Sequence, residues 1–299
     1  MIKVQGKNIR IEGRLYRTAR LDADKYYFVD DPESLIQALR TSGERIDLFT
    51  FMQRVQEKEP KYPYPMEWDN FAAIPITTFD EWWMKQIGFK ARNKAKQAEK
   101  KGVAIREVPF GEELARGIWE VYNETPIRQG RRFYHYGKSP EQVYRESATY
   151  LETSQFIGAY FEDKLIGFIK IVWDETSSQA GLMNIVSLIK HRDKAPTNAL
   201  VAAAVNFCAS RKIPYLVYSN FAYGKKQTDS LSDFKERNAF VRIDVPRYYV
   251  PLTTIGAAAL RMKLHHKLVD RVPESWIAKL RELREAWYAR RYQTARESS

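Results

Sequence analysis

One segment of the sequence concentrates side chains that can bind anions or stack on planar groups. It reads NETPIRQGRRFYHYGKSP over residues 123–140, with four basic residues, three aromatic residues and one histidine. Guanidinium groups bind carboxylates or phosphates through two parallel hydrogen bonds, and aromatic rings stack on planar groups. The segment therefore predicts a substrate-binding surface formed by Arg128, Arg131, Arg132, Tyr134, His135 and Tyr136. The alternative is a connecting loop whose aromatic side chains cover the edge of the core.

Two further segments carry an excess of positive charge. Between Lys85 and Arg106 there are eight basic residues and one acidic residue, in a pattern typical of an exposed helix. The segment KHRDKAPTNAL, residues 190–200, places basic side chains directly before a helix that is predicted to start near Thr197. The positive end of a helix dipole favours phosphate groups. Both segments thus predict a phosphate-binding surface, although solvated helix faces have the same composition.

The overall composition is that of a folded basic protein. The chain has 299 residues, of which 44% are hydrophobic and 13% aromatic, enough for one or two domains with a sizeable core. Its formal net charge of +12 favours a partner that carries phosphates or many negative charges. Solubility alone would also account for this charge.

Several kinds of site are disfavoured by the sequence. The only cysteine, Cys208, cannot form an intrachain disulfide, which points to a reducing, cytoplasmic location. The first residues contain no apolar run typical of a signal peptide, and no stretch is long enough for a membrane span. The four histidines show no metal-site spacing, and His265 and His266 would point apart on a helix. We therefore expect no metal.

The pattern of elements predicts an α+β fold. From Val103 onward the order is β-α-α-β-β-β-α-β-α-β, which indicates a central, mostly antiparallel sheet with flanking helices. Residues 78–102 read as a helix broken near Gly88, and residues 1–84 mix short strands with one helix over PESLIQALRTSG. An amphipathic helix is predicted near the C-terminus, over VPESWIAKLRELREAWYARRYQ.

This order resembles the GNAT (N-acetyltransferase) superfamily. FIGAYFEDKLIGFIKIV resembles the second and third strands of that fold, and FKERNAF resembles its late passage from helix to strand. ARNKAKQAEKKGV followed by YNETPIRQGR resembles the Fem-type branch, which includes peptidoglycan aminoacyltransferases. The resemblance implies a GNAT-like domain over residues 85–250, an N-terminal α/β region over residues 1–84 that could be a partial second unit, and a C-terminal extension over residues 251–299.

The resemblance also implies where an acyl donor would bind. In GNAT proteins the fourth and fifth strands diverge, and the donor enters the gap between them; here that point falls near Ser187 and Tyr218. The donor-binding residues implied are Ser187, Lys190, Arg192, Lys194, Thr197 and Asn198. The acyl-CoA loop of the superfamily is rich in glycine, whereas KHRDKAPTNAL has none. The donor is therefore acyl-CoA or, as in some Fem-type proteins, aminoacyl-tRNA.

The catalytic candidates are few. The resemblance places a proton donor for the leaving group in YSNFAYGKK, where Tyr223 is the predicted residue. A general base would be Glu124, His135 or a water molecule held by Asn184. Backbone N–H groups near residues 186–188 would face the oxyanion.

Two functions of different classes follow. The first is an acyl- or aminoacyltransferase that acts on an amine acceptor, either a small molecule or a compound like a peptidoglycan precursor, with tRNA as a possible partner. The alternative is a non-catalytic GNAT-like protein that binds nucleic acid through its basic surfaces. A peripheral enzyme that modifies lipid-linked substrates would use the same surfaces.

Overall fold

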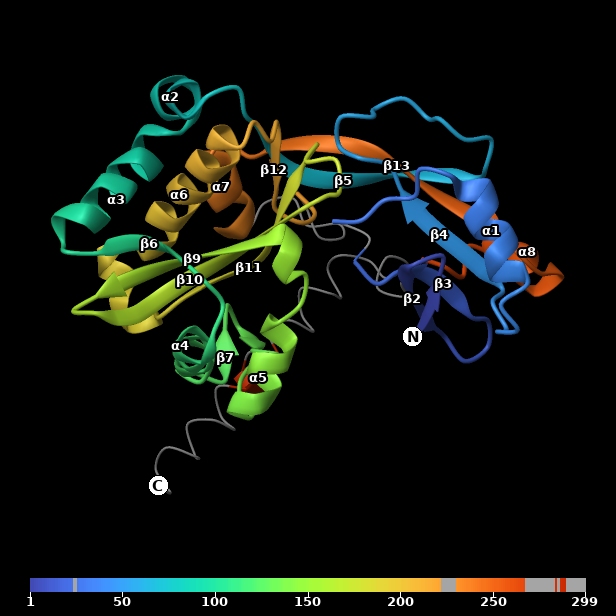
Figure 1. Cartoon of the computed structure of the whole chain (residues 1–299), viewed down its shortest axis with the longest axis horizontal. Coiled ribbons are helices and arrows are strands. Elements are labelled where there is room, and N and C mark those ends of the chain that lie inside the picture. The colour runs from blue at the N-terminus through green and yellow to red at the C-terminus, as the bar shows by residue number, and fades with distance from the viewer. Residues whose placement is uncertain (24–25, 222–229, 267–282, 284–285, 289–299) are drawn as a thin grey trace.

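The computed structural model describes residues 1–23, 26–221, 230–266, 283 and 286–288. Its main feature is one sheet of eleven strands that runs the length of the molecule (Figure 1). In spatial order the strands are β1 (Ile2–Val4), β2 (Lys7–Glu12), β3 (Thr18–Leu21), β4 (Leu48–Met52), β13 (Val241–Pro251), β5 (Met66–Pro75), β12 (Tyr215–Val217), β11 (Ala180–Ser187), β10 (Lys164–Trp173), β9 (Ser154–Phe161) and β6 (Ala104–Val108).

Helices cover both faces of the C-terminal part of this sheet (Figure 1). One face carries α4 (Glu112–Tyr122), α5 (Pro140–Ser147) and a small hairpin of β7 (Ile127–Arg128) and β8 (Arg131–Arg132). The other face carries α6 (Pro196–Ser210), with α3 (Phe89–Lys100) and α7 (Ser230–Arg237) beside it. The remaining helices are α1 (Pro32–Arg40), α2 (Phe79–Glu81), α8 (Thr254–Arg261), a π-helical turn η1 (Trp82–Gln86) and the 3₁₀ turns η2 (Leu151–Thr153) and η3 (Ile189–Lys194).

The predicted α+β order from Val103 onward is confirmed, and local signals account for its boundaries. Ser139 and Gln142 form a reciprocal capping box at the start of α5. Gly102, with φ of 79°, ends the helical segment that precedes β6. Three alanines of α3, at positions 91, 95 and 98, are buried against the body, so the narrow apolar stripe of this basic helix faces inward. The predicted break near Gly88 is also present, because Gly88 precedes the first residue of α3.

The N-terminal region repeats part of the C-terminal arrangement. β2 and β3 are antiparallel, β3 and β4 are parallel, and α1 lies between β3 and β4 in the chain. β10, β11, β12 and α6 follow the same pattern. Because β5 lies between β13 and β12, residues 1–84 contribute a strand to the middle of the sheet. The division into domains stays a prediction, and the repeat is what a partial GNAT-like unit would show.

The predicted C-terminal amphipathic helix, residues 272–293, lies largely outside the described residues. Within the described part of the chain, no helix combines the length and the apolar composition that crossing a membrane requires.

Candidate functional site

The neighbouring strands β11 and β12 are paired only where they begin. Ala180 and Gly181 of β11 pair with Leu216 and Val217 of β12 in parallel. Beyond that point the chain after β12 follows β5 instead, because Tyr218 N–H donates to Ala72 O over 2.7 Å. On its other side β11 stays paired with β10 as far as Ser187. The two strands therefore diverge as expected, and among the described residues β11 has no strand partner on the β12 side after Gly181.

A β-bulge in β11 bends the strand at this divergence. Lys170 pairs with Asn184 and Ile171 with Leu182, which leaves Met183 as an extra residue in β11. Further along, the Leu188 N–H donates to Ile166 O over 2.8 Å and so points toward β10. Because N–H directions alternate along an antiparallel strand, the Ser187 N–H points toward the gap. Of the backbone donors predicted near residues 186–188, only this one is available to a ligand in the gap.

Glu124 and Arg128 join the end of α4 to the end of β11. The Glu124 carboxylate accepts from the backbone N–H groups of Ile189 and Lys190 over 2.7 and 2.9 Å. Arg128 donates to Glu124 over 3.0 Å and to Ser187 O over 2.7 Å. The Arg128 Nε atom is buried and has no hydrogen-bond partner within the described residues.

This geometry does not favour the general-base role predicted for Glu124. Both of its carboxylate oxygens already accept charge-assisted or backbone hydrogen bonds. The same contacts occupy the Ile189 and Lys190 amides, which lie where a GNAT-type loop would present N–H groups to a pyrophosphate. Glu124 therefore connects the end of α4 to the loop before α6.

We expect Glu124→Ala to lower the free energy of unfolding by about 1–3 kcal/mol, because it removes the acceptor of two backbone N–H groups and the carboxylate partner of Arg128, which keeps its carbonyl acceptors Ser187 O and Val121 O. Urea denaturation measures this loss. Glu120→Ala is the matched control, since Glu120 is exposed on the same helix. Equal effects of the two substitutions would contradict the proposed bracing role.

The predicted donor-binding residues gather around η3 and the start of α6, with one exception. Ser187 Oγ and Thr197 Oγ1 lie 2.7 Å apart and link β11 to the first turn of α6. Lys190 and Arg192 are exposed, and neither forms an ion pair within the described part of the chain. Asn198 is buried and donates to Asn238 over 3.3 Å. Asn198 therefore belongs to the core beside α7 and is not available to a donor.

The basic helix α3 ends beside this turn. Lys101 Nζ donates to the backbone oxygen of Asp193 over 2.9 Å and lies 3.3 Å from its carboxylate. Lys194 lies over the ring of Phe161 at 4.5 Å and 3.5 Å from Asp193. The lysines of α3 that remain exposed are Lys90, Lys94, Lys96 and Lys100. The structure thus joins the two basic segments of the sequence into one surface, which we call the α3–η3 surface (residues 90–101 and 189–194).

The arginine-rich segment forms the β7–β8 hairpin on the α4 face of the sheet. Gln129 and Gly130 form its two-residue turn, both with positive φ, as a type I′ turn requires. Arg128 lies under the ring of Phe133, 4.9 Å from its centre. Arg131 and Arg132 are exposed, and neither guanidinium has an ion-pair partner among the described residues. The hairpin therefore offers two unpaired cations near the end of β11.

The aromatic residues that follow are divided between core and surface. The His135 ring stacks on Tyr122 of α4 with centres 4.2 Å apart. Burial, reinforced by Lys138, lowers the pKa of His135 to about 4, so its imidazole is neutral at pH 7. Tyr134 is exposed and has the Lys138 ammonium 3.7 Å from its ring centre. Tyr136 is also exposed, so Tyr134 and Tyr136 can stack on a ligand. His135, by contrast, packs between this segment and Tyr122 of α4.

The other catalytic candidates are placed as follows. Asn184 lies on β11 beside the bulge, opposite Lys170 and on the α4 face. Tyr223 lies outside the described residues. His135 keeps a buried Nδ1 atom without a hydrogen-bond partner within the described ranges. Asn184 and His135 thus lie on one side of the sheet.

Sequence reasoning missed Lys170, a buried lysine on β10. Its ammonium donates to the carbonyl oxygens of Ser147, over 2.9 Å, and Thr149 just past the end of α5. Burial lowers the pKa of Lys170 to about 8. The signal was a lone charge in the apolar strand LIGFIKIVW. Lys170 fixes the carboxyl end of α5 to the sheet below Asn184.

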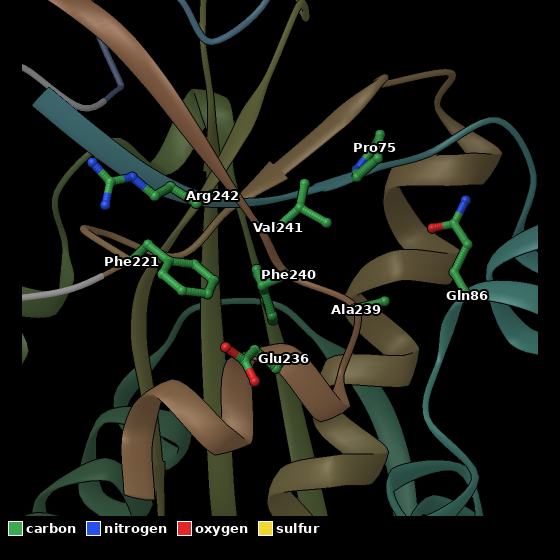
Figure 2. A pocket seen from close by; sticks show the side chains of 8 residues that line it. All are labelled: Pro75, Gln86, Phe221, Glu236, Ala239, Phe240, Val241 and Arg242. Carbon is green, nitrogen blue, oxygen red and sulfur yellow. The ribbon is translucent and has the colours of Figure 1, made fainter. Parts of the chain in front are cut away.

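A separate cavity of about 630 Å³ lies on the side of β12 away from β11, and residues of β5, η1, α7 and β13 line it. Figure 2 shows Phe221, Phe240 and Val241 grouped within it, with Glu236 directed toward the two aromatic rings. None of the predicted site residues that the structure describes lines it. The ring of Phe240, which lines this cavity, lies 5.7 Å from the ring of Tyr218, the residue directly after β12.

Comparison with known proteins shows which solved structures share this architecture. No family profile and no curated protein matches the sequence. Among solved structures, a C-terminal domain (DUF2156) from Agrobacterium fabrum, whose parent protein carries the name lysylphosphatidylglycerol synthetase, has a TM-score of 0.56, 11% identity and coverage of 88% and 87% of the two chains. L-PGS from Bacillus licheniformis has a TM-score of 0.55 and 13% identity, with 86% of each chain covered. FemX has a TM-score of 0.52 and 10% identity, with 80% of this chain and 83% of FemX covered.

These similarities establish the fold. The protein has a GNAT-like, Fem-type architecture, with a large mostly antiparallel sheet flanked by helices, as the sequence predicted. Structures that it resembles over most of its length include L-PGS and FemX.

Proposed function

We propose that this protein is an acyltransferase that transfers an aminoacyl group from a charged tRNA to an amine acceptor. The observation that carries the proposal is the divergence of β11 and β12, with the Ser187 N–H facing the gap and the α3–η3 surface beside its mouth. A gap of this kind admits an extended activated ester, and a basic surface beside it binds the phosphates of a large donor.

The chemistry needs little from the protein beyond positioning. The acceptor amine attacks the ester carbonyl, a C–N bond forms, the C–O bond to the donor ribose breaks, and the ribose hydroxyl leaves with a proton. The Ser187 N–H is a donor for the oxyanion that develops during attack. A water molecule held by Asn184, or the neutral His135, is the described candidate for receiving the proton of the amine, and Tyr223 stays the proposed donor to the leaving oxygen.

Two features favour aminoacyl-tRNA over acyl-CoA as the donor. The loop before α6 lacks glycine, and its Ile189 and Lys190 amides already donate to Glu124. A pyrophosphate therefore finds a carboxylate where GNAT-type binding would require free amides. In addition, lysylphosphatidylglycerol synthetase, the name carried by one structural neighbour, denotes formation of an aminoacyl ester of a lipid.

The acceptor is proposed to bind against the β7–β8 hairpin. Arg131 and Arg132 supply unpaired cations, and Tyr134 and Tyr136 supply exposed rings. This combination suits an amine that also carries phosphate or carboxylate groups and a sugar, such as a peptidoglycan precursor. A lipid-linked amine offers the same groups, so the acceptor panel must contain both free and lipid-linked forms.

The test is a transfer assay with radiolabelled aminoacyl-tRNA and, in parallel, acetyl-, succinyl- and palmitoyl-CoA. We expect the label to move from tRNA to an amine acceptor, with no transfer from the acyl-CoA compounds. Transfer from acyl-CoA alone would overturn the assignment of the donor but would support the assignment as an acyltransferase. Failure of every donor to bind or react would overturn the proposal that this protein is an enzyme.

A second function, non-catalytic nucleic-acid binding, is favoured by one observation, the exposed lysines of α3. It predicts tRNA binding that does not depend on aminoacylation and produces no transfer. Binding of charged and uncharged tRNA with equal affinity, together with no product, would favour this function over the transferase.

A further inference from the structure

Three ligand-type side chains meet on the opposite half of the molecule, far along the sheet from the gap. Glu67 comes from the start of β5, and His265 and His266 follow α8. The Glu67 Oε1 atom lies 3.1 Å from His265 Nε2 and 2.7 Å from His266 Nε2. One carboxylate oxygen and two imidazole nitrogens thus all lie within 4.8 Å of one another.

The end of α8 explains why two adjacent histidines reach the same atom. Lys263 has a φ of 53°, and its N–H donates to Leu260 O while the Leu264 N–H donates to Ala259 O. These two bonds are the Schellman arrangement, which ends a helix and reverses the chain. The expectation that His265 and His266 would point apart was wrong, because it assumed that both lie on a helix.

Neighbouring contacts hold this turn in place. The Tyr16 hydroxyl donates to Leu264 O over 2.7 Å. The His265 side chain is only 5% exposed and packs against the Tyr249 ring, with centres 4.5 Å apart. His266 and Glu67 are 32% and 40% exposed, so the cluster is fixed on one side and open to solvent on the other.

Glu67 carries a negative charge at neutral pH. Burial opposes its ionisation, but the hydrogen bonds from His266 and His265 outweigh burial and hold its pKa below the usual value. The nearest strand partner, Arg247, pairs with Asp69 at 3.1 Å. The cluster therefore combines the Glu67 carboxylate with two imidazoles. The neighbouring Arg247 guanidinium is paired with Asp69.

We propose that Glu67, His265 and His266 bind one divalent transition-metal ion of the zinc type, with a fourth position open to water. Zinc bonds to imidazole nitrogen and carboxylate oxygen are about 2.0–2.2 Å, which places neighbouring ligands about 3.3 Å apart in a tetrahedron. The separations of Glu67 Oε1 from His265 Nε2 and His266 Nε2, 3.1 and 2.7 Å, need only a small expansion, and the ligand atoms of the two histidines already lie within 4.8 Å of each other. Two imidazoles and one carboxylate suit Zn²⁺, Co²⁺ or Ni²⁺ rather than Mg²⁺ or Ca²⁺, which prefer oxygen ligands alone. The ion would fasten the turn after α8 to β5.

Titration of the untagged full-length protein with Zn²⁺, followed by calorimetry, tests the proposal. We expect one ion per chain and a rise in the melting temperature on binding. His266→Ala and Glu67→Gln should each weaken binding at least tenfold. Both are partly exposed, so these variants should fold even if a substitution of the buried His265 does not. Titration with Co²⁺ should add the visible absorption of a tetrahedral site in the wild type but not in His266→Ala or Glu67→Gln.

His191→Asn is the matched control, because His191 is one of the two histidines outside the cluster. It should bind Zn²⁺ as the wild type does. Absence of binding near one equivalent in the wild type would overturn the proposal. Binding that survives in His266→Ala and Glu67→Gln with unchanged affinity would also overturn it, since the ion would then lie elsewhere.

Discussion

Reversing the charge of Lys90, Lys94 and Lys100 should weaken binding of charged tRNA by roughly 100-fold at moderate salt. All three lysines are exposed on α3, and the α3–η3 surface lies beside the proposed donor gap. Replacing them with Glu removes three phosphate contacts and adds three repulsions. The slope of log affinity against log salt should also become shallower, because fewer counterions are released. Filter binding across a salt series measures both quantities.

The substitutions should leave the fold intact. Glu at position 90 suits the start of α3, whereas Glu at position 100 opposes the dipole at its end, so the two helix effects largely cancel. The matched control reverses Lys3, Arg14 and Lys58, which are exposed and lie in the N-terminal region. It changes the net charge equally and should alter affinity less than about threefold. Equal losses in both triple variants would show that binding depends only on net charge and would contradict the assigned surface.

The largest effect on stability is expected for Asp174→Ala, at about 3–5 kcal/mol. The Asp174 carboxylate is 1% exposed and accepts from the Arg54 Nε atom over 3.0 Å and from the Gln179 N–H over 2.9 Å. Arg54 follows β4, so the pair joins the N-terminal region to the turn before β11. Its removal leaves a buried guanidinium with only Asp30 as a carboxylate partner. Chemical denaturation measures the loss.

Asp244→Ala is the control, because Asp244 pairs with Arg242 at 2.9 Å on an exposed part of β13. It should cost less than about 1 kcal/mol. A loss for Asp174→Ala no larger than this would contradict the joining role.

The stabilising effect of Asp174 should depend on pH. Burial opposes its ionisation, but hydrogen bonds from Gln179, Ser178, Thr176 and Arg54 outweigh burial and lower its pKa. A carboxyl whose pKa is lowered by folding stabilises the protein above its unfolded pKa of about 3.9, and this contribution is lost as the pH falls through the folded pKa. The wild type should therefore lose more stability than Asp174→Asn below about pH 4. Parallel curves for the two proteins in that window would show that Asp174 contributes nothing to acid stability.

Local chemistry determined much of the fold before any tertiary contact was known. The order of elements, the capping box at Ser139, the break at Gly88 and the alanine stripe of α3 depend on residues close together in the sequence. The continuous buried runs of β9 and β10 and the polar turn between them have the same local origin. These features predicted an α+β fold with a mostly antiparallel sheet, and the resemblance to the GNAT superfamily implied the position of its diverging strands.

Contacts between distant residues decided the details of the sites. Glu124 lies 65 positions from Ile189, and no local pattern shows that this carboxylate caps the amides of the loop before α6. Asn198 was assigned to the donor, but its contact with Asn238 places it in the core. Glu67 lies 198 positions from His265, so their cluster exists only because β5 and the turn after α8 meet in the folded chain. Sequence spacing reports periodicity within an element, whereas these sites depend on which elements pack together and where each chain reversal points its side chains.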